Sequence, residues 1–173
     1  MHLYGVFCDR NFAEETGSNI YFLSESGNKY SLVLENSIFL NNENYGIIAI
    51  FAKIITIKFC SFIQSVSSKT KSQGLSSVNT DFILIESTLF MDFSMLGAIR
   101  IETTAINGYI NLTSIKVTNC HNTQAGGALS IKGKVSGIIH FSEFINNYSD
   151  DSGGVIYYSC SGEKCEVVIK TNR

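Results

Sequence analysis

The sequence predicts an all-β fold and, within that class, a right-handed, single-stranded parallel β-helix of about six coils. Three observations predict it. A short phrase ending in a bulky apolar residue recurs at nearly even intervals, which is typical of stacked-repeat proteins. Apolar and polar residues alternate with period two inside each copy, as they do in strands. No segment carries the helical apolar period over several turns with capping residues, so no helix is expected.

The recurring phrase places one bulky apolar side chain at the same position in successive coils. It is found at residues 32–39, 55–62, 83–90, 110–117 and 137–144. Its closing residues are separated by 23, 28, 27 and 27 positions, and they are Phe39, Phe62, Phe90, Val117 and Phe144. Equivalent residues of stacked parallel strands lie about 4.8 Å apart. We therefore expect these five side chains to form an inward-facing structural ladder.

Each phrase begins with a strand, because two aliphatic residues stand two positions apart, as in Leu32 and Leu34. A glycine-containing turn follows most phrases. Glycine adopts positive φ readily and lets another strand approach closely. A further short strand follows each turn, so each coil is predicted to contain two or three strands. The predicted turn glycines are Gly97, Gly126, Gly127, Gly153 and Gly154.

The first residues fit the repeat least well. Residues 1–16 are predicted to form an irregular partial first coil or a cap, and residues 17–173 the β-helix repeats. Neither end carries a capping helix, although natural solenoids usually cover the open edge of the last coil. We therefore expect a fragment of a longer β-helix, with continuation of the same chain at both ends.

The composition excludes several classes of protein. Hydrophobic residues make up 45% of the 173 positions, with 12 Phe and 8 Tyr, which argues against disorder. A net charge of −2 with 16% charged residues carries no signature of nucleic-acid binding. No stretch approaches the roughly 20 apolar residues of a membrane span, and no signal peptide is visible. No insertion of this segment into a membrane is expected.

The five cysteines suggest at most one disulfide. Cys160 and Cys165 flank a short turn. They could pair in an oxidising compartment or remain two thiols near one bend. Cys60 lies inside a repeat and is expected to be a small buried hydrophobic residue. No spacing typical of a zinc site occurs, so neither a metal nor a cofactor is expected.

Two short motifs in the coils, FxxN and GGA[ILV], carry a resemblance to a known family. FxxN occurs at Phe39–Asn42 and Phe144–Asn147, and GGA[ILV] at Gly126–Leu129, with near matches at Gly97–Ile99 and Gly153–Ile156. Together they resemble the repeats of polymorphic outer-membrane proteins, which are autotransporter-like surface proteins, and similar repeats in protist surface proteins. The resemblance implies a β-helical stalk displayed at a cell surface and used for adhesion or antigenic variation. FxxN is not kept after Phe62, Phe90 and Val117.

Asparagines after the bends have two candidate roles. The side-chain amide can bond the backbone or the next asparagine along the stack, and Asn42 and Asn147 are predicted to form such a structural ladder. Glycosylation sequons begin at Asn111 and Asn147. Asn111 stands between two inward residues and should face solvent, so it is the candidate glycosylation site.

The rival to a binding role is enzymatic. Parallel β-helices also serve as polysaccharide lyases and hydrolases, which group carboxylates on one exposed strand face. Here one repeat position is filled in turn by Glu35, Lys58, Glu86, Thr113 and His140. This mixed order predicts a solvated row with ion pairs between coils, and no catalytic residue is assigned.

The expected function is therefore non-enzymatic: a segment of a surface-exposed or secreted adhesin-like repeat protein, acting as scaffold and binding surface. The expected partner is a host or neighbouring cell-surface protein or glycan, and the expected location is extracellular or at the cell surface as part of a longer chain. The alternative is a carbohydrate-cleaving or carbohydrate-binding β-helix whose site lies outside this segment. A leucine-rich repeat array is a third reading, but its characteristic leucine and asparagine phrase is absent.

Overall fold

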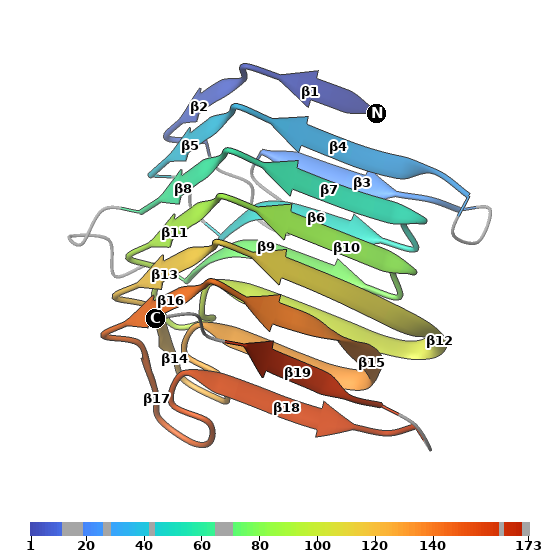
Figure 1. The fold of residues 1–173 in the computed structure, drawn as a ribbon. Coiled ribbons are helices and arrows are strands. Elements are labelled where there is room, and N and C mark those ends of the chain that lie inside the picture. Colours follow the sequence, from blue (N-terminus) through green and yellow to red (C-terminus); the bar gives the residue numbers. More distant parts are fainter. Residues whose placement is uncertain (12–18, 26–28, 42–43, 65–70, 163–164, 171–173) are drawn as a thin grey trace.

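The chain forms a parallel β-solenoid of about six turns, as the repeat predicts (Figure 1). The computed structural model describes residues 1–11, 19–25, 29–41, 44–64, 71–162 and 165–170. These residues contain no helix, and the named strands pair in parallel. In Figure 1 the chain runs leftward along the front and rightward along the back while it descends, which is a right-handed winding.

Three sheet faces surround the core. The front face contains β1 (His2–Tyr4), β4 (Ser31–Glu35), β7 (Ile54–Lys58), β10 (Phe82–Glu86), the second halves of β12 (Ile99–Thr113) and β15 (Leu129–His140), and β19 (Val167–Lys170). The back face contains β3 (Ile20–Leu23), β6 (Asn44–Ile50), β9 (Ser72–Val78), the first halves of β12 and β15, and β18 (Ile156–Cys160). The side face contains β2 (Phe7–Asp9), β5 (Ile38–Leu40), β8 (Ser61–Ile63), β11 (Leu89–Met91), β13 (Lys116–Thr118) and β16 (Glu143–Ile145). The short strands β14 (His121–Asn122) and β17 (Tyr148–Ser149) pair with each other.

The strands β12 and β15 pass around one corner without ending. The first residues of β12 pair with β9 on the back face, and Tyr109–Thr113 pair with β10 on the front face. A register irregularity between Thr103 and Gly108 marks the corner where β12 pairs with β15. The lower part of the front face is therefore connected directly to the back face by continuous strands.

The closing residues of the recurring phrase lie in one column in the core. Rings of Phe39 and Phe62 stack with centroids 4.8 Å apart, and those of Phe62 and Phe90 with centroids 4.9 Å apart. The register continues from Phe90 to Val117 and Phe144. Val117 is buried and Phe144 is half-buried. Burying each ring stabilises the fold by about 1.5–3 kcal/mol.

The predicted turn glycines fall into three groups. Gly97, Gly126 and Gly153 have φ of 74°, 78° and 60°, a conformation that other residues adopt only with strain. Gly127 permits close approach, since a Cβ there would collide with the backbone oxygen atoms of Tyr148 and Gly154. Gly154 itself has open space where its Cβ would be.

The column of phenylalanines also requires glycines on the opposite wall. Gly46 and Gly74 are paired in the back face. A Cβ at Gly74 would lie 2.6 Å from Cδ1 of Phe90, and one at Gly46 would lie 3.4 Å from Cδ1 of Phe62. A Cβ at Gly46 would also lie 2.7 Å from the backbone oxygen of Gly74, so Gly74 makes room for the Phe90 ring and Gly46 for the neighbouring strand.

Residues 1–16 were expected to form an irregular partial first coil or a cap, and the described residues 1–11 of this segment contain two short strands. Strand β1 pairs with β4, and β2 pairs with β5. Leu3 and Cys8 lie partly buried above the core columns. Three-residue strands show too little alternation to be recognised individually in the sequence.

Small polar side chains hold the corner between the front and side faces. The hydroxyls of Ser37, Thr88 and Ser142 each donate to the carbonyl two residues earlier. Each also accepts a backbone N–H from the coil above, at Val6, Cys60 and Ile115 respectively. Buried backbone groups at this bend are thereby satisfied.

Candidate functional site

The outer side of the front face is the candidate site, because it is the longest regular surface of the solenoid. Successive side chains of a strand point to opposite sides, so the residues between the core positions point outward. Pairing in register aligns them in rows along the solenoid axis. We call them the charged row, the middle row and the aromatic row.

The charged row is the repeat position identified in the sequence. Its residues are Glu35, Lys58, Glu86, Thr113, His140 and Lys170, paired strand to strand. Lys58 Nζ lies 3.0 Å from Glu86 Oε2, and Thr113 Oγ1 lies 2.5 Å from His140 Nε2. His2 Nε2 lies 3.4 Å from Glu35 Oε2. The predicted ion pairing between coils is confirmed in this row.

The middle row mixes aliphatic and neutral polar side chains. Its half-buried members are Val33, Thr56, Leu84, Asn111, Ile138 and Val168. Asn111, the candidate glycosylation site, lies on this outer side, where its Oδ1 accepts a hydrogen bond from Thr113 Oγ1 at 3.0 Å. The row offers apolar contact area with a few hydrogen-bonding groups and no formal charge.

The aromatic row runs along the other edge of the front face. Its members in order are Ser31, Ile54, Phe82, Tyr109, Ser136 and, by its backbone contact, Glu166. The rings of Phe82 and Tyr109 are parallel within 2°, with centroids 5.9 Å apart. Tyr109 is 44% exposed. The next residue along the stack is the much smaller Ser136.

A groove opens below Tyr109, where the row changes from aromatic to small. Its volume is about 550 Å³. The described residues that line it are Tyr109, Ser136, Gly137, Cys165, Glu166 and Val168. They come from β12, β15, β19 and the turn before β19, so the groove lies at the lower end of the front face.

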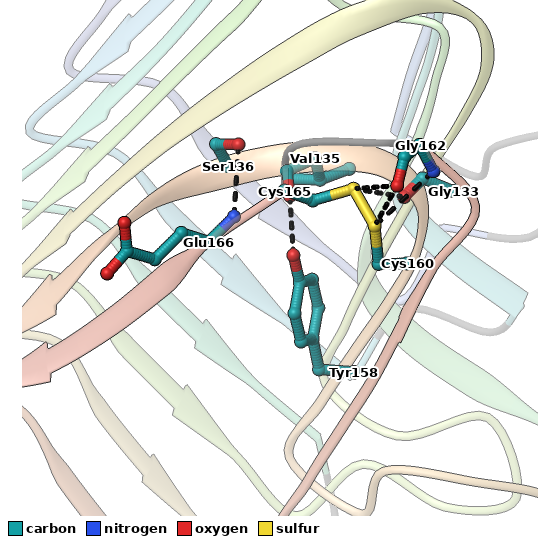
Figure 2. The surroundings of a disulfide bond; sticks show 8 residues. All are labelled: Gly133, Val135, Ser136, Tyr158, Cys160, Gly162, Cys165 and Glu166. Carbon is teal, nitrogen blue, oxygen red and sulfur yellow. Dashed lines mark hydrogen bonds between the residues drawn. A yellow bond between two sulfur atoms is a disulfide. The ribbon is translucent and has the colours of Figure 1, made fainter.

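The disulfide anticipated from the sequence forms one wall of this groove. Cys160 at the end of β18 is bonded to Cys165 just before β19 (Figure 2). Ser161 N donates to Gly133 O at 3.2 Å, and Tyr158 Oη donates to Val135 O at 2.9 Å. The crosslink and these bonds fix the last coil against β15.

The other predicted residue positions are structural. Asn147 accepts from Cys120 N at 2.9 Å through Oδ1 and donates to Val117 O at 2.9 Å through Nδ2. It thus bonds the backbone of the coil above. Asn42 lies outside the described residues. The predicted turn glycines lie at the bends and the phenylalanines of the structural ladder lie in the core, so neither group reaches the front surface.

The three free thiols are shielded to different degrees. Cys60 and Cys120 are buried and Cys8 is partly exposed. Burial raises the pKa of the Cys120 thiol to about 12, and burial also raises the pKa of Cys60. Thiolate nucleophiles need a lowered pKa. Within the described ranges, no group of three or more His, Cys, Asp or Glu could hold a metal ion.

The chain matches no protein-family model, no curated protein and no solved structure. The resemblance to polymorphic outer-membrane protein repeats therefore stays a prediction. In the part of the chain that the structure describes, no helix has the length and apolarity needed to cross a membrane.

The groove and its tyrosine were not identified from the sequence. A signal was present: Phe82, Tyr109 and Ser136 occupy one repeat position and change abruptly from aromatic to small. A step of that kind in an outward row removes side-chain volume at one coil and hollows the surface there.

Proposed function

We propose that the chain is a non-enzymatic segment of an adhesin-like β-helix protein, exposed at a cell surface or secreted, and that its front face binds a partner. The observation that carries the proposal is the middle row. Six half-buried, uncharged side chains, four of them aliphatic, lie in register on the sheet beside a charged row in which Lys58 and Glu86 form an ion pair. Binding surfaces commonly combine an apolar centre with a polar rim.

The size of the face favours weak contacts made many times. Strand geometry gives a face roughly 30 Å along the axis and roughly 17 Å across, about 500 Å². A standard stable interface uses about 800 Å² per partner. One front face is therefore suited to a weak contact, and linked copies would bind far more tightly through avidity. Adhesion by a repetitive surface protein works in this way.

The charged row supports binding more than catalysis. Glycoside hydrolysis needs two carboxyl groups flanking the bond, about 5–10 Å apart. Here Glu86 is paired with Lys58 in the next strand, and Glu35 is paired with His2. Each of the two carboxylates thus has a partner in an adjacent strand.

Beads coated with many copies of the protein provide the test, because they reproduce avidity. Wild-type beads should attach to cultured cells, and Leu84→Lys in the middle row should abolish attachment. Leu40→Lys, an outward position on the side face, is the matched control. Both variants must retain the wild-type β-sheet circular dichroism.

Three outcomes would overturn the proposal. They are no attachment by wild-type beads, equal loss in both variants, and release of reducing sugar ends from polysaccharides by the purified protein. The last result would favour the carbohydrate-cleaving alternative. Antibody staining of intact, unpermeabilised cells that produce the protein should be positive if the chain is displayed at the surface.

A further inference from the structure

We propose that the groove below Tyr109 is a subsite for one neutral pyranose ring of a glycan. The inference rests on the proposed function, because it names the class of ligand that the front face would take. It depends on three features: an aromatic ring with one uncovered face, a floor with little side-chain volume, and an unpaired carboxylate on a backbone that is bonded to β15.

The tyrosine ring is covered on one side only. Phe82 lies parallel to it in the strand above, within 2° and with centroids 5.9 Å apart. On the side of the next coil its register partner is Ser136, whose side chain is too small to cover a ring. Tyr109 accordingly lines the groove and is 44% exposed. An uncovered aromatic face of this kind packs against the C–H face of a sugar.

The floor of the groove is backbone more than side chain. Gly137 follows Ser136 and has a φ of 153°, and a Cβ there would collide with the backbone oxygen of Ile110. Glycine is therefore required for β15 to approach β12 at this point. A Cβ at Gly137 would point toward β12 and not into the groove, so the hollow opens because the outward residue of this strand, Ser136, has a small side chain.

Glu166 forms the far wall, and its backbone is bonded to β15. Its backbone N–H donates to Ser136 Oγ at 3.2 Å, and its backbone oxygen accepts from Gly137 N at 2.8 Å. The preceding residue is Cys165 of the disulfide. In Figure 2 the Glu166 side chain extends away from the disulfide. Among the described residues this carboxylate makes no hydrogen bond or ion pair.

This combination suits a neutral sugar. A carboxylate accepts strong hydrogen bonds from hydroxyl groups, and the Ser136 and Tyr109 hydroxyls add further polar groups. The single carboxylate among the described lining residues would repel acidic sugars. A hydrolase site uses two carboxyl groups; the described lining residues supply one, which is enough to bind a sugar hydroxyl. Its volume of about 550 Å³ falls within the range of small-molecule sites.

The test uses the full chain produced in a host without N-glycosylation, so that no glycan at Asn111 covers the face. Binding of methyl pyranosides and short oligosaccharides of glucose, galactose, mannose and N-acetylglucosamine is measured by saturation-transfer NMR and calorimetry. Tyr109→Ala and Glu166→Gln should each weaken binding about tenfold or more. Tyr109→Phe keeps the ring and should bind within about threefold of wild type.

Tyr21→Ala is the matched control, since Tyr21 is an exposed strand tyrosine on the back face. It should bind sugars as wild type does. The inference is overturned if no neutral sugar binds, if Tyr109→Ala binds as wild type, or if only amine probes such as choline bind. Cell attachment that needs Leu84 but not Tyr109 would overturn the subsite alone. Sugar binding that needs Tyr109, without cell attachment, would overturn the adhesin proposal alone.

Discussion

The contact between Gly74 and Phe90 allows the core packing to be tested directly. Phe90 is fully buried, stacks on Phe62 at 4.9 Å and lies 6.5 Å from Phe93 by ring centroids. A Cβ at Gly74 would lie 2.6 Å from Cδ1 and 2.9 Å from Cε1 of Phe90, and 3.1 Å from Ala98 O. Two of these three contacts are with the ring, so the cost of Gly74→Ala depends on the ring being present.

The magnitudes follow from known core substitutions. Phe90→Ala should destabilise the protein by about 3–5 kcal/mol, because it removes a buried ring and leaves a cavity. At about 2–4 °C per kcal/mol for this chain length, the melting temperature should fall by roughly 6–20 °C. Gly74→Ala should cost about 1–3 kcal/mol through overpacking. In the double variant the added methyl group enters the cavity. The destabilisation of the double variant should therefore be smaller than the sum of the two single destabilisations by about 0.5–3 kcal/mol.

The free energy of unfolding of the wild type, the two single variants and the double variant is measured by urea unfolding followed by circular dichroism. Gly154→Ala is the control, since a Cβ there meets open space, and it should lie within about 0.5 kcal/mol of wild type. The contact would be refuted if the destabilisation of the double variant equalled the sum of the two single destabilisations within about 0.3 kcal/mol. So would a Gly74→Ala variant as stable as the Gly154→Ala control.

Three further predictions concern the charged row, a buried thiol and the last coil. Replacing Lys58 and Glu86 singly and together by Gln should give a coupling energy of about 0.2–1 kcal/mol that shrinks in 1 M salt, because the pair is partly exposed; a coupling above about 2 kcal/mol in a double-mutant cycle would contradict this. The pKa of Cys120 is about 12 in the folded protein against 9.0 without burial, so the unfolded chain loses this proton first. Its contribution to stability is full below about pH 9 and is lost by about 1.4 kcal/mol per pH unit as the pH rises toward 12. Cys120→Ala should therefore reduce the fall in the free energy of unfolding between pH 9 and 11, as measured by urea unfolding. A fall as large as that of the wild type would refute the prediction. Reducing the bond between Cys160 and Cys165 should lower the free energy of unfolding by about 2 kcal/mol through loop entropy. Amide hydrogen exchange should become faster in β19 while β7 stays protected, and the Cys165→Ser variant should behave like the reduced protein. Equally faster exchange in both strands would argue against a local effect.

The core was readable from the sequence because it repeats the same chemistry. Phe39, Phe62 and Phe90 stack in the predicted column, since a ring in one coil is best covered by a ring in the next. The strands before them were equally visible through their period-two alternation. A ladder of identical residues leaves a strong periodic signal, and the fold follows from it.

The bends were harder to read because different residues do the same work there. Ser37, Thr88 and Ser142 bond in one pattern, yet Cys60 and Ile115 occupy equivalent places in the coils between them. Ser, Thr and Cys can each donate to the carbonyl two residues earlier, whereas Ile115 has no group that can do so. The buried carbonyl recurs in every coil, whereas the type of residue beside it changes from coil to coil.

The glycines opposite the rings show a further limit. Gly74 looks like an ordinary strand residue in the sequence, and the ring of Phe90 explains it. Its role depends on a contact across the core between residues about sixteen positions apart. Periodicity along the chain carries no information about which column faces which.

The candidate binding groove lies where the repeat is broken. Stacked coils give a flat surface as long as each outward position keeps a side chain of similar size. At Ser136 the outward row loses volume, and the disulfide turn adds a wall that no other described coil has. A repeat that selects for stacking fixes its core columns, whereas a ligand needs one place that differs from all the others. Functional residues in such a chain should therefore be sought among the departures from the repeat, and Tyr109 with Glu166 is the pair that this reasoning selects.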